Sequence, residues 1–99
     1  MLHTDEFKPA IISLCRRLQV KRLDIFGSAT TDGFGPESDV DVLVEFECNA
    51  GDLFDRYFDL KENLEQILGR DVHVVVERAL KNPYFKASIE RTRRNIYAA

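Results

Sequence analysis

The feature that most constrains the fold is an apolar side chain at every second position in two separate segments, with mostly polar side chains between. In residues 39–46 the apolar set is Val40, Val42, Val44 and Phe46, and in residues 71–77 it is Val72, Val74 and Val76. Successive side chains of a β-strand point to opposite faces, so each segment is predicted to be a strand with one buried face. A layer of helices must then cover that face.

Helical spacing predicts the covering layer. A stripe at Phe7, Ile11, Leu14, Cys15 and Leu18 predicts a helix over residues 5–18, and another at Leu53, Tyr57, Leu60, Leu64 and Ile67 predicts one over 52–68, ended by Gly69. Asn82 and Pro83 are typical of an N-cap and a first helical residue. They begin a final helix expected to place Phe85, Ile89 and Ile96 on its inner face.

Two shorter segments complete the pattern. Residues 21–26 are predicted to form a strand, and the turn formers of residues 30–38 fit a single helical turn. The predicted fold class is α/β (α+β), a small mixed β-sheet with helices packed on one face and polar residues on the other.

Length and composition set further bounds. At 99 residues and 44% hydrophobic content, residues 1–99 are expected to form a single domain. Cys15 and Cys48 are not spaced as metal ligands, and no apolar run approaches the roughly 18 residues that a membrane-spanning helix needs. We therefore expect no membrane association and a cytoplasmic location.

The charges are segregated along the chain. Eight of the 17 acidic residues lie between Asp32 and Asp55 with no Lys or Arg among them, which leaves 9 acidic and all 14 basic residues for the rest. Such a carboxylate run is either solvated or neutralised by cations. The pI near 5.3 disfavours direct nucleic-acid binding.

Chemistry is expected where two motifs meet on the polar face. Asp39 and Asp41 are two residues apart on one strand, which places both carboxylates on the same side. Like charges so close repel each other unless a cation lies between them, and Mg²⁺ suits a pair of carboxylates completed by substrate phosphates. Gly27 and Ser28 directly follow the preceding strand, where unpaired amides and a hydroxyl would bind an anion such as phosphate.

Taken together, Gly27-Ser28 and Asp39-x-Asp41 resemble the signature of the DNA polymerase β-like nucleotidyltransferase superfamily, in its minimal nucleotidyltransferase branch. The resemblance implies the nucleotidyltransferase fold over nearly the whole chain. It also implies ATP as substrate, with its phosphates against Gly27 and Ser28. Catalysis would use Mg²⁺, with Mn²⁺ as the alternative, on Asp39 and Asp41, with transfer of AMP to a hydroxyl acceptor.

Two positions depart from the family pattern. Where the family has a third carboxylate, this chain has His73, which could be an altered but working catalytic residue, a weakened one, part of an inactive nucleotide-binding protein, or a structural histidine. Asp71 on the same strand face could substitute. Thr30-Thr31 replaces the usual Ala-Arg, so a cation near the phosphates would have to come from Lys21, Arg22 or a partner.

Two functions follow from the resemblance. The first is an enzyme that adds AMP to a tyrosine of a HEPN-domain toxin and so acts as its antitoxin. The second is a weakened or inactive nucleotide-binding antitoxin that neutralises its partner by contact. Exposed aromatic side chains would favour contact, and the candidates are Phe54, Phe58, Tyr84 and Tyr97.

Overall fold

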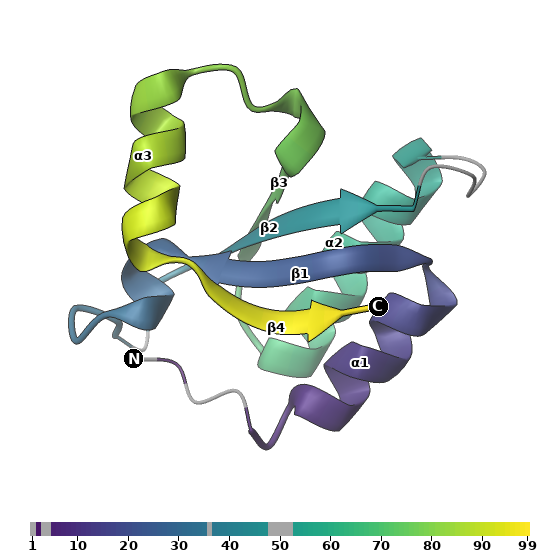
Figure 1. The fold of residues 1–99 in the computed structure, drawn as a ribbon. Helices are drawn as coiled ribbons and strands as arrows, with labels where there is room; N and C mark the ends of the chain where they lie inside the picture. The colour runs from purple at the N-terminus through teal and green to yellow at the C-terminus, as the bar shows by residue number, and fades with distance from the viewer. Residues whose placement is uncertain (1, 3–4, 36, 48–52) are drawn as a thin grey trace.

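A computed structural model describes residues 2, 5–35, 37–47 and 53–99 of the chain (Figure 1). Its elements in chain order are α1 (Lys8–Arg17), β1 (Val20–Phe26), the 3₁₀ turn η1 (Gly27–Thr30), β2 (Val40–Phe46), α2 (Leu53–Leu68), β3 (Val72–Val76), the 3₁₀ turn η2 (Glu77–Ala79), α3 (Pro83–Thr92) and β4 (Arg94–Ala98). None of the helices in the described ranges is long and apolar enough to cross a membrane.

The four strands form one mixed sheet in the order β3-β2-β1-β4. Strand β1 runs antiparallel to both β2 and β4, whereas β2 and β3 are parallel. Parallel neighbours need a crossover connection, and α2 provides it between β2 and β3. The mixed sheet with its three helices confirms the predicted fold class.

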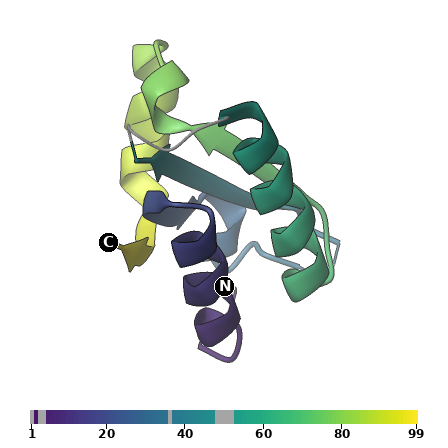
Figure 2. The same cartoon turned by 90° about the vertical axis from the view of Figure 1, so that its right-hand side faces the viewer.

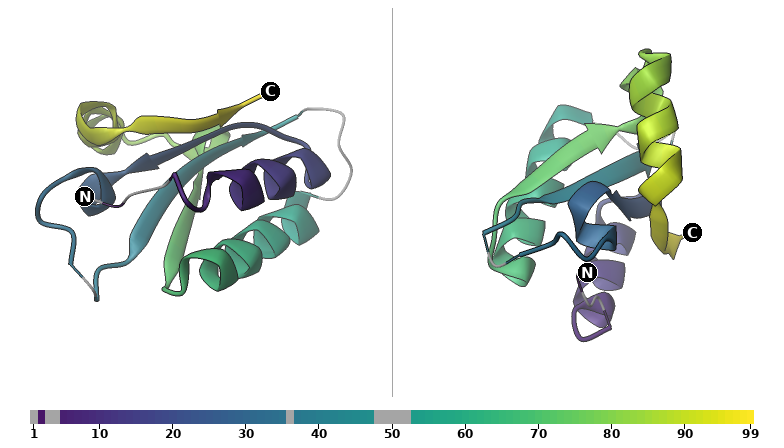
Figure 3. Two further views of the ribbon diagram at one scale, coloured as in Figure 1. Left: turned by 90° about the horizontal axis from the view of Figure 1, so that it is seen from below. Right: turned by 90° about the vertical axis from the view of Figure 1, so that its left-hand side faces the viewer.

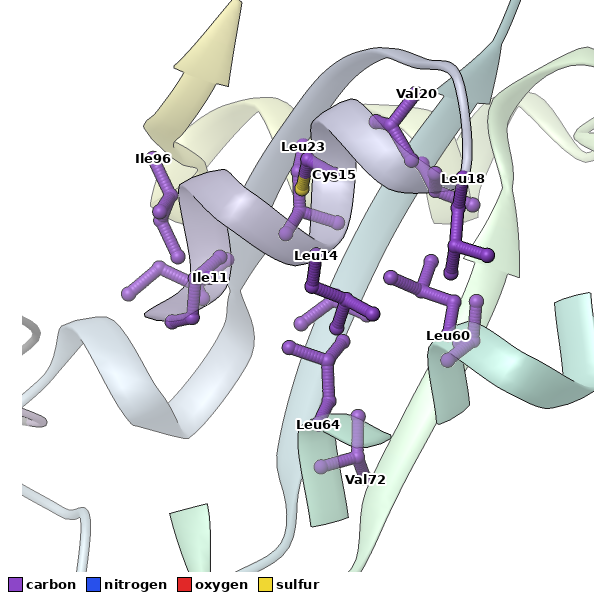
Figure 4. Packing of buried hydrophobic residues seen from close by; sticks show 14 of the residues in the cluster. Ile11, Leu14, Cys15, Leu18, Val20, Leu23, Leu60, Leu64, Val72 and Ile96 are labelled. Carbon is purple, nitrogen blue, oxygen red and sulfur yellow. The ribbon is translucent and has the colours of Figure 1, made fainter. Parts of the chain in front are cut away.

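Helices α1 and α2 cover one face of the sheet, as the view from below shows (Figure 3, left). The edge-on view places both helices on the same side (Figure 2). The side chains between them come from the alternating positions predicted for the strands. They include Val40, Val42, Val44, Val72 and Val74 of β2 and β3, and Ile11, Leu14, Leu60 and Leu64 of the two helices. Figure 4 shows Val72 together with these four helical side chains. Burial of this cluster is the main driving force for folding.

The opposite face is polar at one end and apolar at the other. Phe26 and Leu43 point to this face and form a small second cluster with Ile89 of α3. Helix α3 therefore lies on the side of the sheet away from α1 and α2 (Figure 3). It leaves the end that carries Asp41 and His73 open to solvent.

The chain beyond Thr92 corrects the prediction of a final helix reaching Ile96. Helix α3 ends at Thr92, Arg93 adopts extended backbone angles, and Ile96 belongs to β4. The helical spacing of Phe85, Ile89 and Ile96 was misleading. The residues of β4 pair with β1, and this pairing satisfies the backbone hydrogen-bonding groups of β4 without a helix. Ile96 is buried, but in the cluster beneath α1 rather than on α3.

The helical turn expected within residues 30–38 lies earlier, at Gly27–Thr30. Gly27 has a φ of +70°, which turns the chain away from the sheet as soon as β1 ends. The Thr30 hydroxyl closes the turn by donating to the Gly27 carbonyl at 3.0 Å. The helical turn therefore begins at the glycine that was predicted to contact phosphate.

Candidate functional site

The polar end of the open sheet face brings together three side chains singled out from the sequence. Asp39 immediately precedes β2, Asp41 lies within it, and His73 lies on β3. The parallel register pairs Asp41 directly with His73. The position aligned with the expected third carboxylate is thus beside the aspartate pair, while Asp71 lies just before β3 and is exposed.

His73 and Asp39 are in direct contact. The His73 Nε2 lies 2.8 Å from Asp39 Oδ2, and the two side chains are 61% and 47% exposed. An ionised carboxylate only accepts hydrogen bonds, so the imidazole donates through Nε2–H. The Nδ1 of a neutral His73 then carries the free lone pair.

Asp41 lies deeper than its two neighbours. Burial raises the pKa of the Asp41 carboxyl, and the negative charge of Asp39 raises it further, while the charge of a protonated His73 acts in the opposite direction. The site therefore concentrates negative charge that its own residues only partly compensate. A cation bound between the carboxylates would relieve that repulsion.

Gly27 lies against the Asp41 carboxylate. A Cβ atom at position 27 would be only 2.8 Å from Asp41 Oδ2, closer than van der Waals contact permits. The positive φ of Gly27 adds a second reason why only glycine fits. The sequence indicated a glycine for close approach, and the group that approaches it is Asp41.

The amide and hydroxyl groups of the turn are only partly as expected. The prediction of an unpaired amide is wrong for Gly27, because its N–H donates to Thr92 Oγ1 at 2.8 Å. Ser28 is exposed, and its hydroxyl has no hydrogen-bond partner among the residues that the structure describes. Of the two predicted phosphate contacts, Ser28 is therefore the one with an exposed hydroxyl that could bind a phosphate oxygen.

The cations suggested as replacements for the missing arginine are engaged elsewhere. Lys21 pairs with Glu45 at 3.3 Å, and Arg22 pairs with the buried Asp24 at 3.2 Å. Thr31, at the position of that arginine, donates its hydroxyl to the Ser28 carbonyl. The turn is thus braced by hydroxyl groups rather than by a positive charge.

Asp39 and Asp41 are the residues here that could hold a divalent cation. No group of three or more His, Cys, Asp or Glu side chains placed to bind a metal occurs in residues 2, 5–35, 37–47 and 53–99. Two carboxylates are nevertheless sufficient for Mg²⁺ when substrate phosphates and water complete its six ligands. The donor chemistry and the uncompensated charge at Asp41 fit such an ion.

A pocket of about 230 Å³ lies between α3 and the sheet on the same face, lined among others by Leu43, Lys86 and Ile89. Leu43 follows Asp41 on the same side of β2. Arg93 also lines this pocket, and its guanidinium binds the buried Asp24. It is therefore not free to contact a polyanion.

Sequence comparison places these residues in a known family. The profile of the nucleotidyltransferase domain family matches residues 10–96. A protein of Methanocaldococcus jannaschii, named "putative protein adenylyltransferase MJ1379", is 40% identical over 74 residues, which are 75% of this chain and 74% of that protein.

Solved structures with the same fold agree. One described as a "putative minimal nucleotidyltransferase" is 34% identical, with a TM-score of 0.72 over 88% of this chain and 86% of that one. The minimal nucleotidyltransferase antitoxin in a complex with the tri-AMPylated Shewanella oneidensis HEPN toxin has a TM-score of 0.68 at 18% identity, over 98% and 74% of the respective chains. At that identity the second likeness shows the fold alone.

Proposed function

The chain belongs to the nucleotidyltransferase domain family, and from this premise we propose that it transfers AMP from ATP to a hydroxyl group of a protein. The observation that carries the proposal is the convergence of Asp39, Asp41 and His73 at the open end of the sheet, with Gly27 against Asp41. The name of the Methanocaldococcus jannaschii relative supports the choice of a protein acceptor.

In this proposal Asp39 and Asp41 are the catalytic residues that hold the divalent cation, Mg²⁺ or Mn²⁺. The bound ion would neutralise the phosphates and stabilise the charge that develops at the reacting phosphorus. Ser28 would contact a phosphate oxygen through its hydroxyl, and Gly27 would set the direction of the turn. Both residues lie at the end of β1, beside Asp41.

The proposed transfer exchanges one bond at the α-phosphorus of ATP for another. The acceptor oxygen forms a bond to the α-phosphorus of ATP, the bond between that phosphorus and the oxygen of the β-phosphate breaks, and pyrophosphate leaves with the electron pair. The acceptor hydroxyl must lose a proton, and the free Nδ1 of His73 is a suitable base because Nε2–H is held by Asp39.

We propose a HEPN-type toxin as the protein acceptor, with a tyrosine as the modified residue. The support is the fold shared with the antitoxin that is bound to an AMPylated HEPN toxin. Of the four aromatic side chains considered as anchors for a partner, Phe54 at 69%, Phe58 at 42% and Tyr84 at 85% are exposed, whereas Tyr97 packs against the core.

A second candidate is an antitoxin that acts by contact alone. The observation that favours it is the imidazole of His73 in place of a carboxylate, because neutral histidine is a poor Mg²⁺ ligand. Such a protein would bind its partner and inhibit it without ATP.

The test uses ATP labelled either at the α- or at the γ-phosphate, incubated with the chain, Mg²⁺ and a HEPN-type toxin as the candidate partner. Nucleotidyl transfer labels the partner from α-labelled ATP only, and Asp41→Asn abolishes the label. Label from γ-labelled ATP would indicate phosphoryl transfer and contradict the proposal. Absence of label together with full inhibition of the partner would establish the contact mechanism instead.

A further inference from the structure

The last turn of α3 holds the turn that follows β1. Thr92 Oγ1 accepts the Gly27 N–H at 2.8 Å, a contact between residues 65 positions apart in the chain. The Thr92 hydroxyl in turn directs its own hydrogen toward the carbonyl oxygens of Ser88 and Ile89, each 3.5 Å away. Thr92 therefore acts toward Gly27 as an acceptor only.

Gly27 is restrained from three directions. Thr92 binds its N–H, Thr30 donates to its carbonyl at 3.0 Å, and the carboxylate of Asp41 occupies the space beside its Cα. The Phe26–Gly27 peptide is thus held by Thr92, and the Gly27–Ser28 peptide by Thr30 of the same turn. Of the three restraints, the one from Thr92 comes from a different element, the last turn of α3.

Thr92 is itself held in place by its neighbours. Arg93 donates to Asp24 Oδ2 through Nε at 2.7 Å, and Asn95 donates to Asp24 Oδ1 at 2.8 Å. Asp24 is fully buried in β1, three residues before Gly27. The junction of α3 and β4 is therefore anchored on the same strand whose end it restrains.

We propose that Thr92 is a positioning residue that fixes the orientation of the Gly27–Ser28 turn for nucleotide phosphate. This inference rests on the proposed function, since it assumes that the turn binds ATP. Loss of the acceptor leaves the Gly27 N–H without its partner, so the peptide can rotate and Ser28 moves with it. Nothing in the sequence marks Thr92 for this role, because the contact exists only once α3 has packed on the sheet.

The test compares Thr92→Val, which keeps the shape and loses the acceptor, with Thr92→Ser, which keeps it. Binding of ATP with Mg²⁺ is measured by calorimetry on the folded proteins. Thr92→Val should weaken ATP binding by up to about tenfold, because the energy of the lost hydrogen bond limits what ordering the turn on binding can cost, and Thr92→Ser should restore it. Ser88→Ala, which removes a hydroxyl one turn earlier on α3, serves as the matched control and should bind like the wild type.

A second measurement keeps the inference testable without nucleotide. Hydrogen exchange of the Gly27 amide, followed by NMR, should accelerate in Thr92→Val and in Thr92→Ala but not in Thr92→Ser. Equal ATP affinity in wild type and Thr92→Val would overturn the positioning role while leaving the proposed function intact. If the wild type itself bound no ATP, the proposed function and this inference would both fall.

Discussion

At the scale of single residues, Gly27 and Ser28 separate the roles of backbone and side chain in the same turn. Gly27→Ala forces a Cβ against the Asp41 carboxylate and strains a positive φ, so we expect it to reduce both ATP and metal binding more than tenfold. Ser28→Ala removes one neutral hydroxyl contact, worth about 0.5–1.5 kcal/mol, and should weaken ATP binding alone. Calorimetry with ATP and with Mn²⁺ distinguishes the two, and identical affinities in both variants would place the phosphate site elsewhere.

Asp41 gives a prediction that separates stability from metal binding. The pKa of the Asp41 carboxyl is raised in the folded protein, so its ionisation lowers the stability of the fold. This loss of stability is absent at low pH and appears as the pH rises through the folded pKa. Asp41→Asn should therefore be at least as thermally stable as the wild type at pH 7 and lose this advantage in acid. Metal titration of the same variant should show no binding.

Unchanged metal affinity in Asp41→Asn would contradict the site. Glu45→Gln, which changes a carboxylate further along β2 that pairs with Lys21, is the matched control. It should leave metal binding unchanged.

At the scale of elements, Asn82 begins α3 as the sequence predicted. Its side-chain oxygen accepts hydrogen bonds from the backbone amides of Tyr84 at 2.9 Å and Phe85 at 3.2 Å. Asn82→Ala should lower the free energy of unfolding by about 1 kcal/mol, the usual value of an N-cap, in a urea titration. A loss below about 0.3 kcal/mol would mean that α3 is held by its packing alone.

Local patterns predicted most of these elements, and tertiary contacts decided the rest. The alternation in β2 and β3 identified both strands and their buried faces, because burial on one face leaves a period of two in the sequence. It also placed Asp39, Asp41 and His73 on one side. Strand β4 was missed because Ile96 also fits the helical spacing of Phe85 and Ile89. Its strand conformation depends on pairing with β1, which no local pattern encodes.

In the candidate site, too, local sequence patterns indicated some features, whereas tertiary contacts determined others. Glycine after a strand indicated close approach at Gly27, yet neither the contact with Asp41 nor the Thr92 hydrogen bond has a sequence signal. That residues 1–99 form a single domain stays a prediction.

At the scale of the whole molecule, a buried ionic network joins β1 to the end of the chain. Asp24 is fully buried and pairs with Arg93 and Arg22, while Arg93 also contacts Glu77 and Glu90. Burial alone would raise the pKa of Asp24, but hydrogen bonds from Asn95, Arg93 and Arg22 together lower it below its ordinary value. The network therefore needs Asp24 ionised.

A pH-dependent stability follows. The contribution of Asp24 is fully present above the unfolded-state pKa of about 4 and is lost as the pH falls through the lower folded pKa. Asp24→Asn should cost about 3 kcal/mol at pH 7, with the difference from the wild type shrinking in acid. Thermal unfolding between pH 2 and 7 measures this, and a constant difference over that range would contradict it.

The most direct test of the central claim, that Asp39, Asp41 and position 73 form one site for metal-dependent nucleotidyl transfer, is the rate of transfer by His73→Asp in Mg²⁺. The substitution adds an oxygen ligand beside Asp41, where the register places it. Restoring about 3–4 kcal/mol of transition-state stabilisation would raise the rate roughly a hundred- to a thousandfold. Without metal, the third carboxylate should lower the melting temperature by repulsion, and Mg²⁺ should restore it.

The account predicts a rate in His73→Asp at least about a hundredfold above wild type. Asp71→Asn, which changes the carboxylate just before β3, should leave the wild-type rate unchanged. Measurable rates that are equally Mg²⁺-dependent and within about twofold of each other for wild type and His73→Asp would show that position 73 lies outside the metal site. That result would contradict the account.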